Sequence, residues 1–437
     1  MIRMLLSRVF TDRSVWLLPV AGFALTSGIG LMVFGGAMYF YRLQDPWLAD
    51  VYFVYATAAL ILLVIPMLAL MHSAARLLAR RRDERLAALR LLGAGSGQLR
   101  RLVLAEAGTL AAAGIAGGAL LYTALMPAVG LLPFAGSPMG VDGLWLGPGL
   151  LAAACAVLVV FAFAAALTGL RRVEITPLGV RTRQVSQKVW WGRAVVALAG
   201  VVVVFVLYVF VPVPNELLAA VVGFAFLAVP LLAVQLVGPW VLKLVTLIHH
   251  RRAKTAERLV AARNVLEAPQ QMWRQVGGVA VAAFIGVIAG CGMALVGAAN
   301  PEYMGEEDLM LLGDVQRGVW LTLAVAFLMT ACSVGLNQTA EILDRRQLYS
   351  GLAAMGFSLS HLSRIRILSV MRSLAAVLLI AVGAACVVAL PIVGAAALTA
   401  PVAVATVALV LVAGVVMIRG GMSATTPTLR SVAFSHR

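Results

Sequence analysis

Residues 51–80 read VYFVYATAALILLVIPMLALMHSAARLLAR and continue directly into RRDERLAALRLLGAGSGQLRRLVL at residues 81–104. The first stretch is apolar over more than the roughly 20 residues that a helix needs to cross a bilayer. The second is basic, broken by glycines, and followed by another apolar run. A similar basic segment, DRRQLYSGLAAMGFSLSHLSRIRI, occupies residues 344–367 between two further apolar runs. The chain therefore places the same short element twice between long apolar segments.

A shift of 263 positions superimposes the two basic segments, aligning Arg82 with Arg345, Leu89 with Leu352, Gly93 with Gly356, Leu99 with Leu362 and Arg101 with Arg364. In the first copy Leu86, Leu89 and Leu92 share a helical face, and the glycines predict a turn near 93–97 because glycine is costly inside a helix. In the second copy Leu348, Leu352 and Met355 recur, the helix breaks at Gly356, and it restarts at 361–367.

The composition places most of the chain in a membrane. Of its 437 residues 62% are hydrophobic and 12% charged, whereas soluble proteins average about 25% charged residues. The net charge of +16 would favour nucleic acid in a soluble chain. In a membrane chain it reflects Arg and Lys gathered in cytoplasmic loops, so we expect no nucleic-acid partner.

Ten apolar runs are long enough to be spans, and we predict an all-α integral membrane protein. The predicted spans are 15–40, 51–79, 102–126, 147–170, 190–212, 216–246, 275–298, 317–343, 367–391 and 398–419. With the N-terminus inside, the predicted outer loops are 41–50, 127–146, 211–216, 299–316 and a short turn near 392–397. These loops and the adjacent helix ends hold only Arg42 and Arg317 of the 34 basic residues. They hold nine of the 18 acids: Asp45, Asp50, Asp142, Glu216, Glu302, Glu306, Glu307, Asp308 and Asp314. This asymmetry predicts that both termini are cytoplasmic.

The spans group as four, two and four, with a pseudo-two-fold axis along the membrane normal relating the two outer groups. We predict a first repeat at 1–172, a two-span connector at 173–254 and a second repeat at 255–437. Each repeat is predicted to begin with an interface helix. In the second helix Leu259, Val260, Val265 and Leu266 form the apolar positions, and Trp273 suits the headgroup level, as Trp16 does in the first repeat.

Polar residues inside the predicted spans are few. Glu106 and Arg372 lie about one turn inside spans three and nine; they either meet at the bundle axis or extend to the inner interface. Gln235, Asn337 and Gln338 are candidates for hydrogen bonds between helices. The cysteines are scattered singly, so no metal site is expected. The acidic stretch 301–314 is either a solvated loop or a contact for a cationic peptide.

The repeated basic element has two readings. It is either an amphipathic loop resting on anionic lipid or a ridge that docks into a groove of a cytoplasmic protein. Its occurrence twice, each time after an overlong apolar helix, favours docking. No frame of the GxxxxGK[ST] type surrounds Lys188, Lys243 or Lys254, so any ATP-driven activity requires another chain.

The stretch ERLAALRLLGAGSGQLRRLVLAEA at 84–107 resembles the coupling segment of the FtsX-like permease domain of ABC transporters, a group that includes MacB, LolC/LolE and BceB relatives. The resemblance implies a two-domain permease subunit in a bacterial plasma membrane. It implies no enzymatic site of its own, two copies of a partner ATPase that binds ATP-Mg, and export or extraction of a lipid or peptide. The implied docking residues are Arg82, Arg85, Leu89, Leu92, Gly93, Arg345, Leu352, Met355 and Gly356.

This chain departs from that family in two respects. Its outer loops are too short for the large extracellular domain of many relatives, so another subunit would have to supply one. The second segment also lacks an acid at the position matching Glu84. Two other functions remain open: a sensory or scaffold protein that relays a signal to a kinase, and an autonomous secondary transporter. The scarcity of acidic or Lys side chains at mid-membrane weighs against the transporter.

Overall fold

The computed structural model describes residues 13–43, 46–80, 95–174, 191–210, 216–298, 305–399 and 401–433. Within these ranges the chain is helical except for one short hairpin, as expected for an all-α protein. The chain divides into two compact units, and the division does not follow the sequence order strictly. Unit 1 comprises residues Met1–Gln184 and Cys332–Gln347; unit 2 comprises Val185–Ala331 and Leu348–Arg437.

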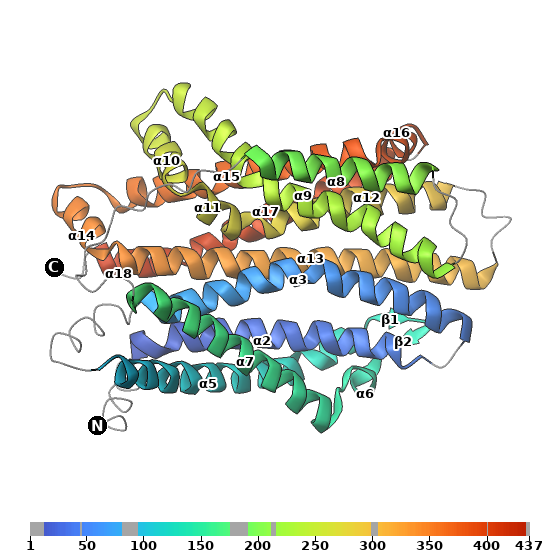
Figure 1. Ribbon diagram of the computed structural model, residues 1–437, viewed down its shortest axis with the longest axis horizontal. Coiled ribbons are helices and arrows are strands. Elements are labelled where there is room, and N and C mark those ends of the chain that lie inside the picture. The colour runs from blue at the N-terminus through green and yellow to red at the C-terminus, as the bar shows by residue number, and fades with distance from the viewer. Residues whose placement is uncertain are drawn as a thin grey trace. The chain divides into compact units, whose positions relative to one another are not determined.

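Unit 1 is built on three long helices that lie side by side (Figure 1). Its elements are α2 (Arg13–Tyr41), α3 (Pro46–Arg80), α5 (Ser96–Gly130), β1 (Pro133–Phe134), β2 (Ser137–Pro138), α6 (Gly140–Leu144), α7 (Gly147–Glu174) and the last part of α13 (Glu306–Asp344). Helix α2 packs against both α3 and α5. The strands form an antiparallel hairpin at the opposite end of the unit from the start of α5.

At the hairpin end of unit 1, the connecting segment is held to the helices by aromatic packing and hydrogen bonds. Phe134 is buried and packs edge-on against Phe40, with ring centroids 5.3 Å apart. The Tyr122 hydroxyl donates to Leu144 O at 2.6 Å and accepts from Leu146 N at 3.2 Å. In the segment predicted as a 127–146 loop, residues 127–130 belong to α5, and α6 packs on α2 and α5.

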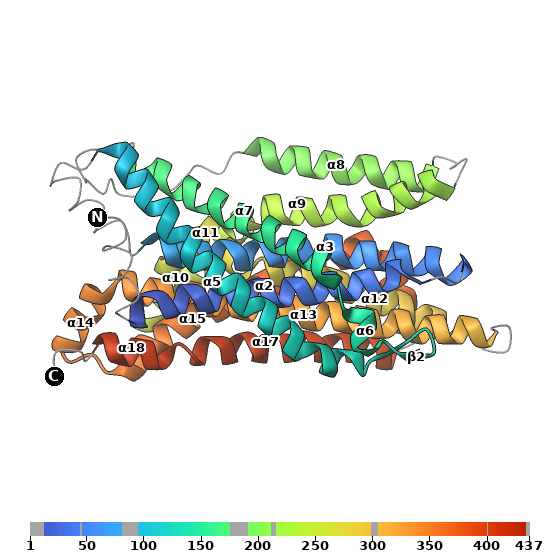
Figure 2. The same ribbon diagram turned by 90° about the horizontal axis from the view of Figure 1, so that it is seen from below.

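Unit 2 contains the remaining helices, including those of the predicted connector. These are α8 (Trp191–Phe210), α9 (Glu216–Arg251), α10 (Ala256–Glu267), α11 (Pro269–Val276), α12 (Gly278–Ala298), the first part of α13, α14 (Arg346–Ala354), α15 (Leu359–Val388), α16 (Leu390–Thr399), α17 (Pro401–Ser423) and α18 (Thr426–Ala433). Helices α8 and α9 form an antiparallel pair (Figure 2). Helix α15 contacts α9, α10, α11 and α12.

The helices indicate a multi-pass membrane protein. Eight helices in the described part of the chain are long and apolar enough to span a bilayer, and a ninth span results if α11 and α12, bent by 50°, count together. Helices occupy most of each of the ten predicted ranges, but α8 offers only the shorter apolar stretch Val195–Leu207. Large apolar side chains such as Leu379 and Val387 are exposed, which lipid contact would explain.

Two predicted loops and one predicted span end differ from the structure in detail. The turn predicted near 392–397 is helical, because α16 continues the apolar run after a break at Ala389. The predicted outer loop 299–316 is helical from Glu306, where Glu306, Glu307 and Asp308 occupy the first turn of α13. Carboxylates there compensate the positive end of the helix dipole. Helix α9 also continues to Arg251, five residues beyond the predicted span end at 246.

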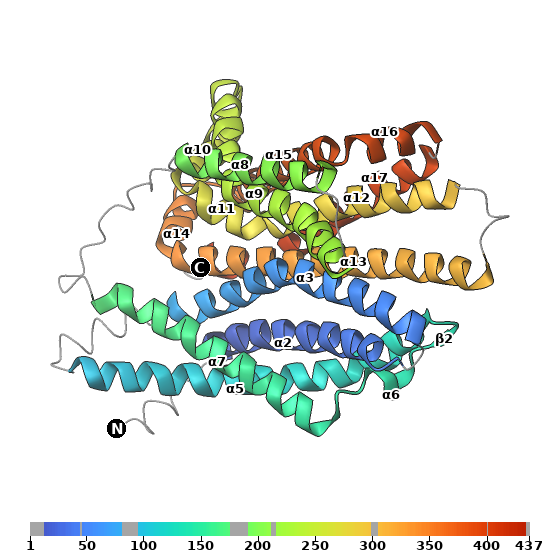
Figure 3. The ribbon, with the colours of Figure 1, turned by 45° about the vertical axis from the view of Figure 1, so that its right-hand side comes forward.

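The interface helix predicted to begin the second repeat corresponds to the helix α10, and of its four predicted apolar positions Val265 is buried. Ala261, Ala262 and Val265 are the buried residues, and α10 packs through them on α9 and α15, whereas Leu259 and Val260 are exposed. The turn between α9 and α10 projects from the rest of unit 2 (Figure 3). The first predicted interface helix, at 1–14, lies almost entirely outside the described residues.

Candidate functional site

Only the last part of the first basic segment, from Gly95 onward, lies within the described residues. Arg82, Arg85, Leu89, Leu92 and Gly93 all lie outside the described residues. The description resumes at Gly95, and α5 begins at Ser96, inside the predicted turn at 93–97. Gly95 occupies the N-cap position of α5 with extended backbone angles and offers no side-chain acceptor to the first turn.

The second basic segment is described completely. Helix α13 ends at Asp344, α14 follows from Arg346, and the chain turns at Gly356, whose φ is +91°. The Gly356 N–H donates to Ala353 O and the Phe357 N–H donates to Leu352 O, both at 3.1 Å. This pair of bonds is a Schellman motif, which requires the left-handed conformation that glycine adopts without strain. The predicted break at Gly356 is therefore present.

The helix that follows begins earlier than predicted. Helix α15 starts at Leu359, not His361, because the Ser358 side chain caps it by accepting from the His361 N–H at 3.4 Å. Ser96 and Leu359 are 263 positions apart, which is the offset that aligns the two basic segments in the sequence. Both helix restarts therefore occur at equivalent positions.

An exposed apolar surface surrounds the Gly356 turn. Leu348, Met355 and Phe357 are 52%, 70% and 46% exposed, and Leu352 is partly buried. We refer to these four residues as the tip surface. Arg345 is exposed at the end of α13, where its guanidinium lies 3.6 Å from the Glu341 carboxylate. Apolar side chains this exposed at the end of a helix are suited to a partner protein or a lipid surface.

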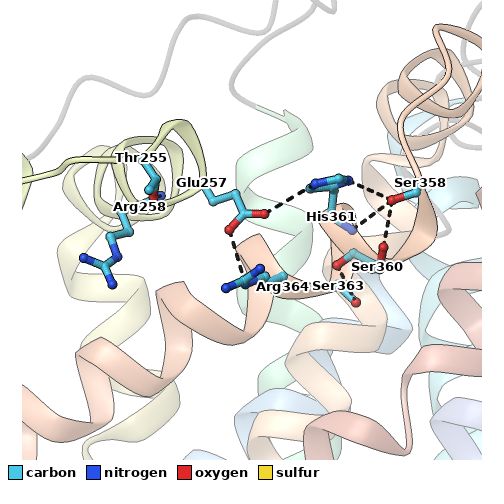
Figure 4. A network of polar contacts seen from close by, with 8 residues as sticks. All are labelled: Thr255, Glu257, Arg258, Ser358, Ser360, His361, Ser363 and Arg364. Carbon is cyan, nitrogen blue, oxygen red and sulfur yellow. Dashed lines mark hydrogen bonds and ion pairs between the residues drawn. The ribbon is translucent and has the colours of Figure 1, made fainter.

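A polar cluster ties the start of α15 to α10 (Figure 4). The Glu257 carboxylate lies 3.3 Å from Arg364 Nε and 3.7 Å from His361 Nε2. The other His361 ring nitrogen, Nδ1, is 2.8 Å from Ser358 Oγ. Thr255 caps α10 by accepting from the Arg258 N–H and so helps to fix the turn that carries Glu257. The predicted interface helix and the helix after the tip surface are thus linked directly.

Gln235 and Asn337 both bond between helices. Gln235 Oε1 accepts from the Trp273 ring N–H at 2.8 Å, and its Nε2 donates to Gly277 O at 3.1 Å. Trp273 is therefore buried inside unit 2 against Gly238, while its predicted position at the headgroup level stays a prediction. The bulk of the ring is accommodated because Gly238 has no side chain.

Asn337 belongs to a hydrogen-bonded group between α13 and α3 in unit 1. Its Nδ2 donates to Ser73 Oγ at 2.6 Å and to Ser333 O at 3.0 Å. The Ser73 and Ser333 hydroxyls are 2.8 Å apart, and Ser73 also donates to Ala69 O. The other amide candidate, Gln338, is buried and donates to Glu341 within its own helix at 3.5 Å. The bond from Asn337 to Ser73 confirms the prediction that Asn337 bonds between helices.

Glu106 and Arg372 are both partly buried and belong to different units. Thr109 Oγ1 donates to the Glu106 main-chain oxygen at 3.1 Å in α5. Arg372 lines a small recess of unit 2 together with residues of α9 and α10. The expectation that they either meet at the bundle axis or extend to the inner interface stays a prediction.

One buried charged residue was not predicted from the sequence. Arg366 is only 6% exposed, and its Nη2 donates to Thr425 Oγ1 at 2.9 Å, which joins α15 to the segment before α18. The available signal was its spacing: Arg366 lies one turn from Leu362 and from Val370 on the buried face of α15. Among the described residues no group of His, Cys, Asp or Glu could hold a metal ion. No protein-family model, characterised protein or solved structure matches the chain.

Proposed function

We propose that this chain is the membrane-spanning permease subunit of an ABC transporter of the FtsX/MacB mechanotransmission type. It lies in a bacterial plasma membrane with both termini in the cytoplasm. Two copies of a separate ATPase bind ATP-Mg and dock on the two basic segments. The resulting motion drives export or extraction of a lipid or peptide, and the chain itself carries no catalytic residue.

The repeated helix restart is the observation that best supports this proposal. Two long helices, α3 and α13, precede the two basic segments, and α5 and α15 restart 263 positions apart. At 1.5 Å per residue the 39 residues of α13 extend about 58 Å, against a hydrocarbon core of about 30 Å. A helix of this length can carry movement from the cytoplasm into the bilayer.

The tip surface supports docking of a protein rather than simple contact with solvent. Met355 and Phe357 flank the Gly356 turn, whose Schellman bonds fix its geometry. A rigid, exposed apolar ridge loses little conformational entropy when it enters a groove, which favours binding. Leu89 and Leu92 are the matching apolar residues that we assign to the first segment.

The first test is Met355→Asp. Because Met355 is 70% exposed, the substitution should leave the helix bundle folded while placing a charge in the proposed interface. The full chain is purified in mild detergent, co-purifying chains are identified, and ATPase activity is measured. We expect a P-loop ATPase with the wild type and at least about a tenfold loss of its retention with the variant, as for a residue central to an interface.

The matched control is Leu309→Asp, which alters an exposed leucine near the start of α13, on the predicted outer side. It should retain the ATPase like the wild type. Equal retention by Met355→Asp and the wild type would contradict docking at this surface. Transport by the isolated chain in response to an ion gradient would contradict the permease-subunit proposal as a whole.

A further inference from the structure

Arg372 differs from the other buried arginine of α15. Arg366 is bonded to Thr425, but the partly buried Arg372 makes no hydrogen bond or ion pair to any residue in the described ranges. Five N–H donors and a permanent charge without a partner are costly at the edge of a membrane protein interior. An anionic ligand would compensate this charge.

Arg372 faces a recess where three elements meet within unit 2. The lining residues are Thr246 and His249 of α9, Ala261, Ala262 and Val265 of α10, and Ser369, Arg372 and Ser373 of α15. The recess holds about 10 Å³, which is room for about one water molecule or one oxygen atom of a larger ligand. A ligand would therefore insert an oxygen and leave its main body outside.

The donors available to such a ligand are few and cationic. The three hydroxyls of the lining already donate to main-chain oxygens: Thr246 to Leu242, Ser369 to Arg366 and Ser373 to Ser369. The remaining donors are the Arg372 guanidinium and the His249 ring. A guanidinium binds two phosphate oxygens through two parallel hydrogen bonds, here one to the inserted oxygen and one to an oxygen that stays outside the recess.

The surroundings of the recess also favour an anion with an apolar body. Arg251, Arg252, Lys254 and Arg258 are exposed at the end of α9 and the start of α10. The nearby acid Glu257 is already engaged by His361 and Arg364. The exposed side chains of Leu259 and Val260 on α10 add apolar surface suited to acyl chains.

We propose that this recess binds a phosphate group, either the phosphodiester of an anionic phospholipid or free phosphate, through Arg372. Basic pockets between membrane helices commonly bind anionic headgroups in this way. The site lies where α9, α10 and α15 meet, so an occupied site would hold α10 against the bundle. The proposal does not depend on ATPase docking and concerns different residues from the tip surface.

The test titrates the full chain in detergent with dioleoylphosphatidylglycerol and with dioleoylphosphatidylcholine, and native mass spectrometry measures the bound fraction. The wild type should bind one phosphatidylglycerol in preference to phosphatidylcholine. Arg372→Gln should weaken this binding by about tenfold, because two charge-assisted hydrogen bonds are lost. Arg263→Gln is the matched control, since it removes a charge from the exposed side of α10 outside the recess, and it should bind like the wild type.

A second arm separates the two sources of phosphate. Isothermal titration with inorganic phosphate should give no Arg372-dependent heat if the ligand is a lipid. Arg372-dependent heat without phosphatidylglycerol preference would support the site with free phosphate as its ligand. Equal binding of both probes by the wild type and Arg372→Gln, or no binding of either, would overturn the proposal.

Arg372→Lys is a second variant, which keeps the proposal testable if the glutamine variant does not fold. Lysine keeps the charge but lacks the two-pronged donor geometry, so phosphatidylglycerol affinity should fall between the wild-type value and that of Arg372→Gln. Thermal unfolding in the same detergent shows which variants are folded. If only the lysine variant is folded, an affinity equal to that of the wild type would also overturn the assignment of Arg372.

Discussion

Helices α5 and α15 begin at equivalent positions but are held in their units by different means. In unit 1, α5 packs on α2 through glycines: a side chain on Gly118 would collide with Ala24 O and Gly28 N, each 2.8 Å from the Cβ position. The positions matching Gly114 and Gly118 in α15 are Val377 and Ala381, and both are fully buried. One helix relies on close backbone approach, and the other on side-chain packing.

The two helix starts differ as well. Gly95 leaves the first turn of α5 without a side-chain cap, while Ser358 caps α15 and Glu257 ties its first turn to α10. Positions that match at the 263-residue offset thus carry different amounts of local stabilisation. A matching helix start does not require matching interactions, because each unit needs only one way to fix each helix.

The largest effect is expected from Gly118→Ala. The new methyl group would meet the main chain of α2, which cannot move aside as a flexible side chain could, so the free energy of unfolding should fall by about 3 kcal/mol. Gly117→Ala is the control, because its nearest neighbour is at an ordinary 3.4 Å. Unfolding in SDS titrations measures both. Equal stability of the two variants would show that α2 and α5 are not in close backbone contact.

Ser358→Ala should have the next largest effect. It removes the acceptor for the His361 N–H at the start of α15 and should lower the free energy of unfolding by about 1 kcal/mol.

Gly95→Ser is the opposite change, because it adds a capping side chain at the start of α5. A side chain there meets nothing within 4 Å, and the backbone is already extended. It should stabilise by a few tenths of a kcal/mol, roughly the measured difference between serine and glycine caps. A loss of stability in Gly95→Ser would be inconsistent with the N-cap assignment.

Asn337→Leu tests the hydrogen bonds between α3 and α13. Ser73 in α3 bonds to Ser333 and Asn337 in α13, which lie 260 and 264 positions later in the chain, on either side of the position that matches Ser73 at the 263-residue offset. Leucine of similar size should cost about 0.6 kcal/mol per lost interhelical bond. Thr322→Val is the control, because its hydroxyl bonds to Gly318 within α13. A double-mutant cycle with Ser73→Ala should be non-additive; strict additivity would argue against the contact.

Glu257→Gln should have the smallest effect. Its partners His361 and Arg364 are largely exposed, so the lost ion pairs should lower the unfolding free energy by less than about 1 kcal/mol. Salt screens such pairs, so the difference from the wild type should shrink at high ionic strength. Unfolding at low and high salt measures it. A difference that stays constant with salt would mean that packing, not charge, links α10 to α15.

The positions of the helices could be predicted largely from the sequence, because apolar length alone determines where a chain can cross a bilayer. The break at Gly356 was also predictable, since few residues other than glycine adopt that φ. The faces were harder to predict. Trp273 suited a headgroup by its chemistry, but the missing side chain of Gly238, 35 positions earlier, opened a buried place for it.

The candidate site was predicted in part. Leu352, Met355 and Gly356 were identified from the alignment of two segments, but the exposure of Phe357 and the contacts of Glu257 were not. The four-two-four grouping, the domain boundaries and the docking role of Arg82, Arg85, Leu89, Leu92 and Gly93 stay predictions. Local spacing carries no information about which distant carboxylate will lie beside a given helix start.

The sequence by itself determined that the chain is helical and membrane-embedded, with two similar basic segments 263 positions apart. These properties follow from hydrophobicity and from the backbone preferences of glycine, which act within a few residues of each position. Only the tertiary structure decided that α10 turns alanines rather than Leu259 inward, and that Arg372 lines a recess. Those outcomes depend on the shapes of α9 and α15, which are brought together only when the chain folds.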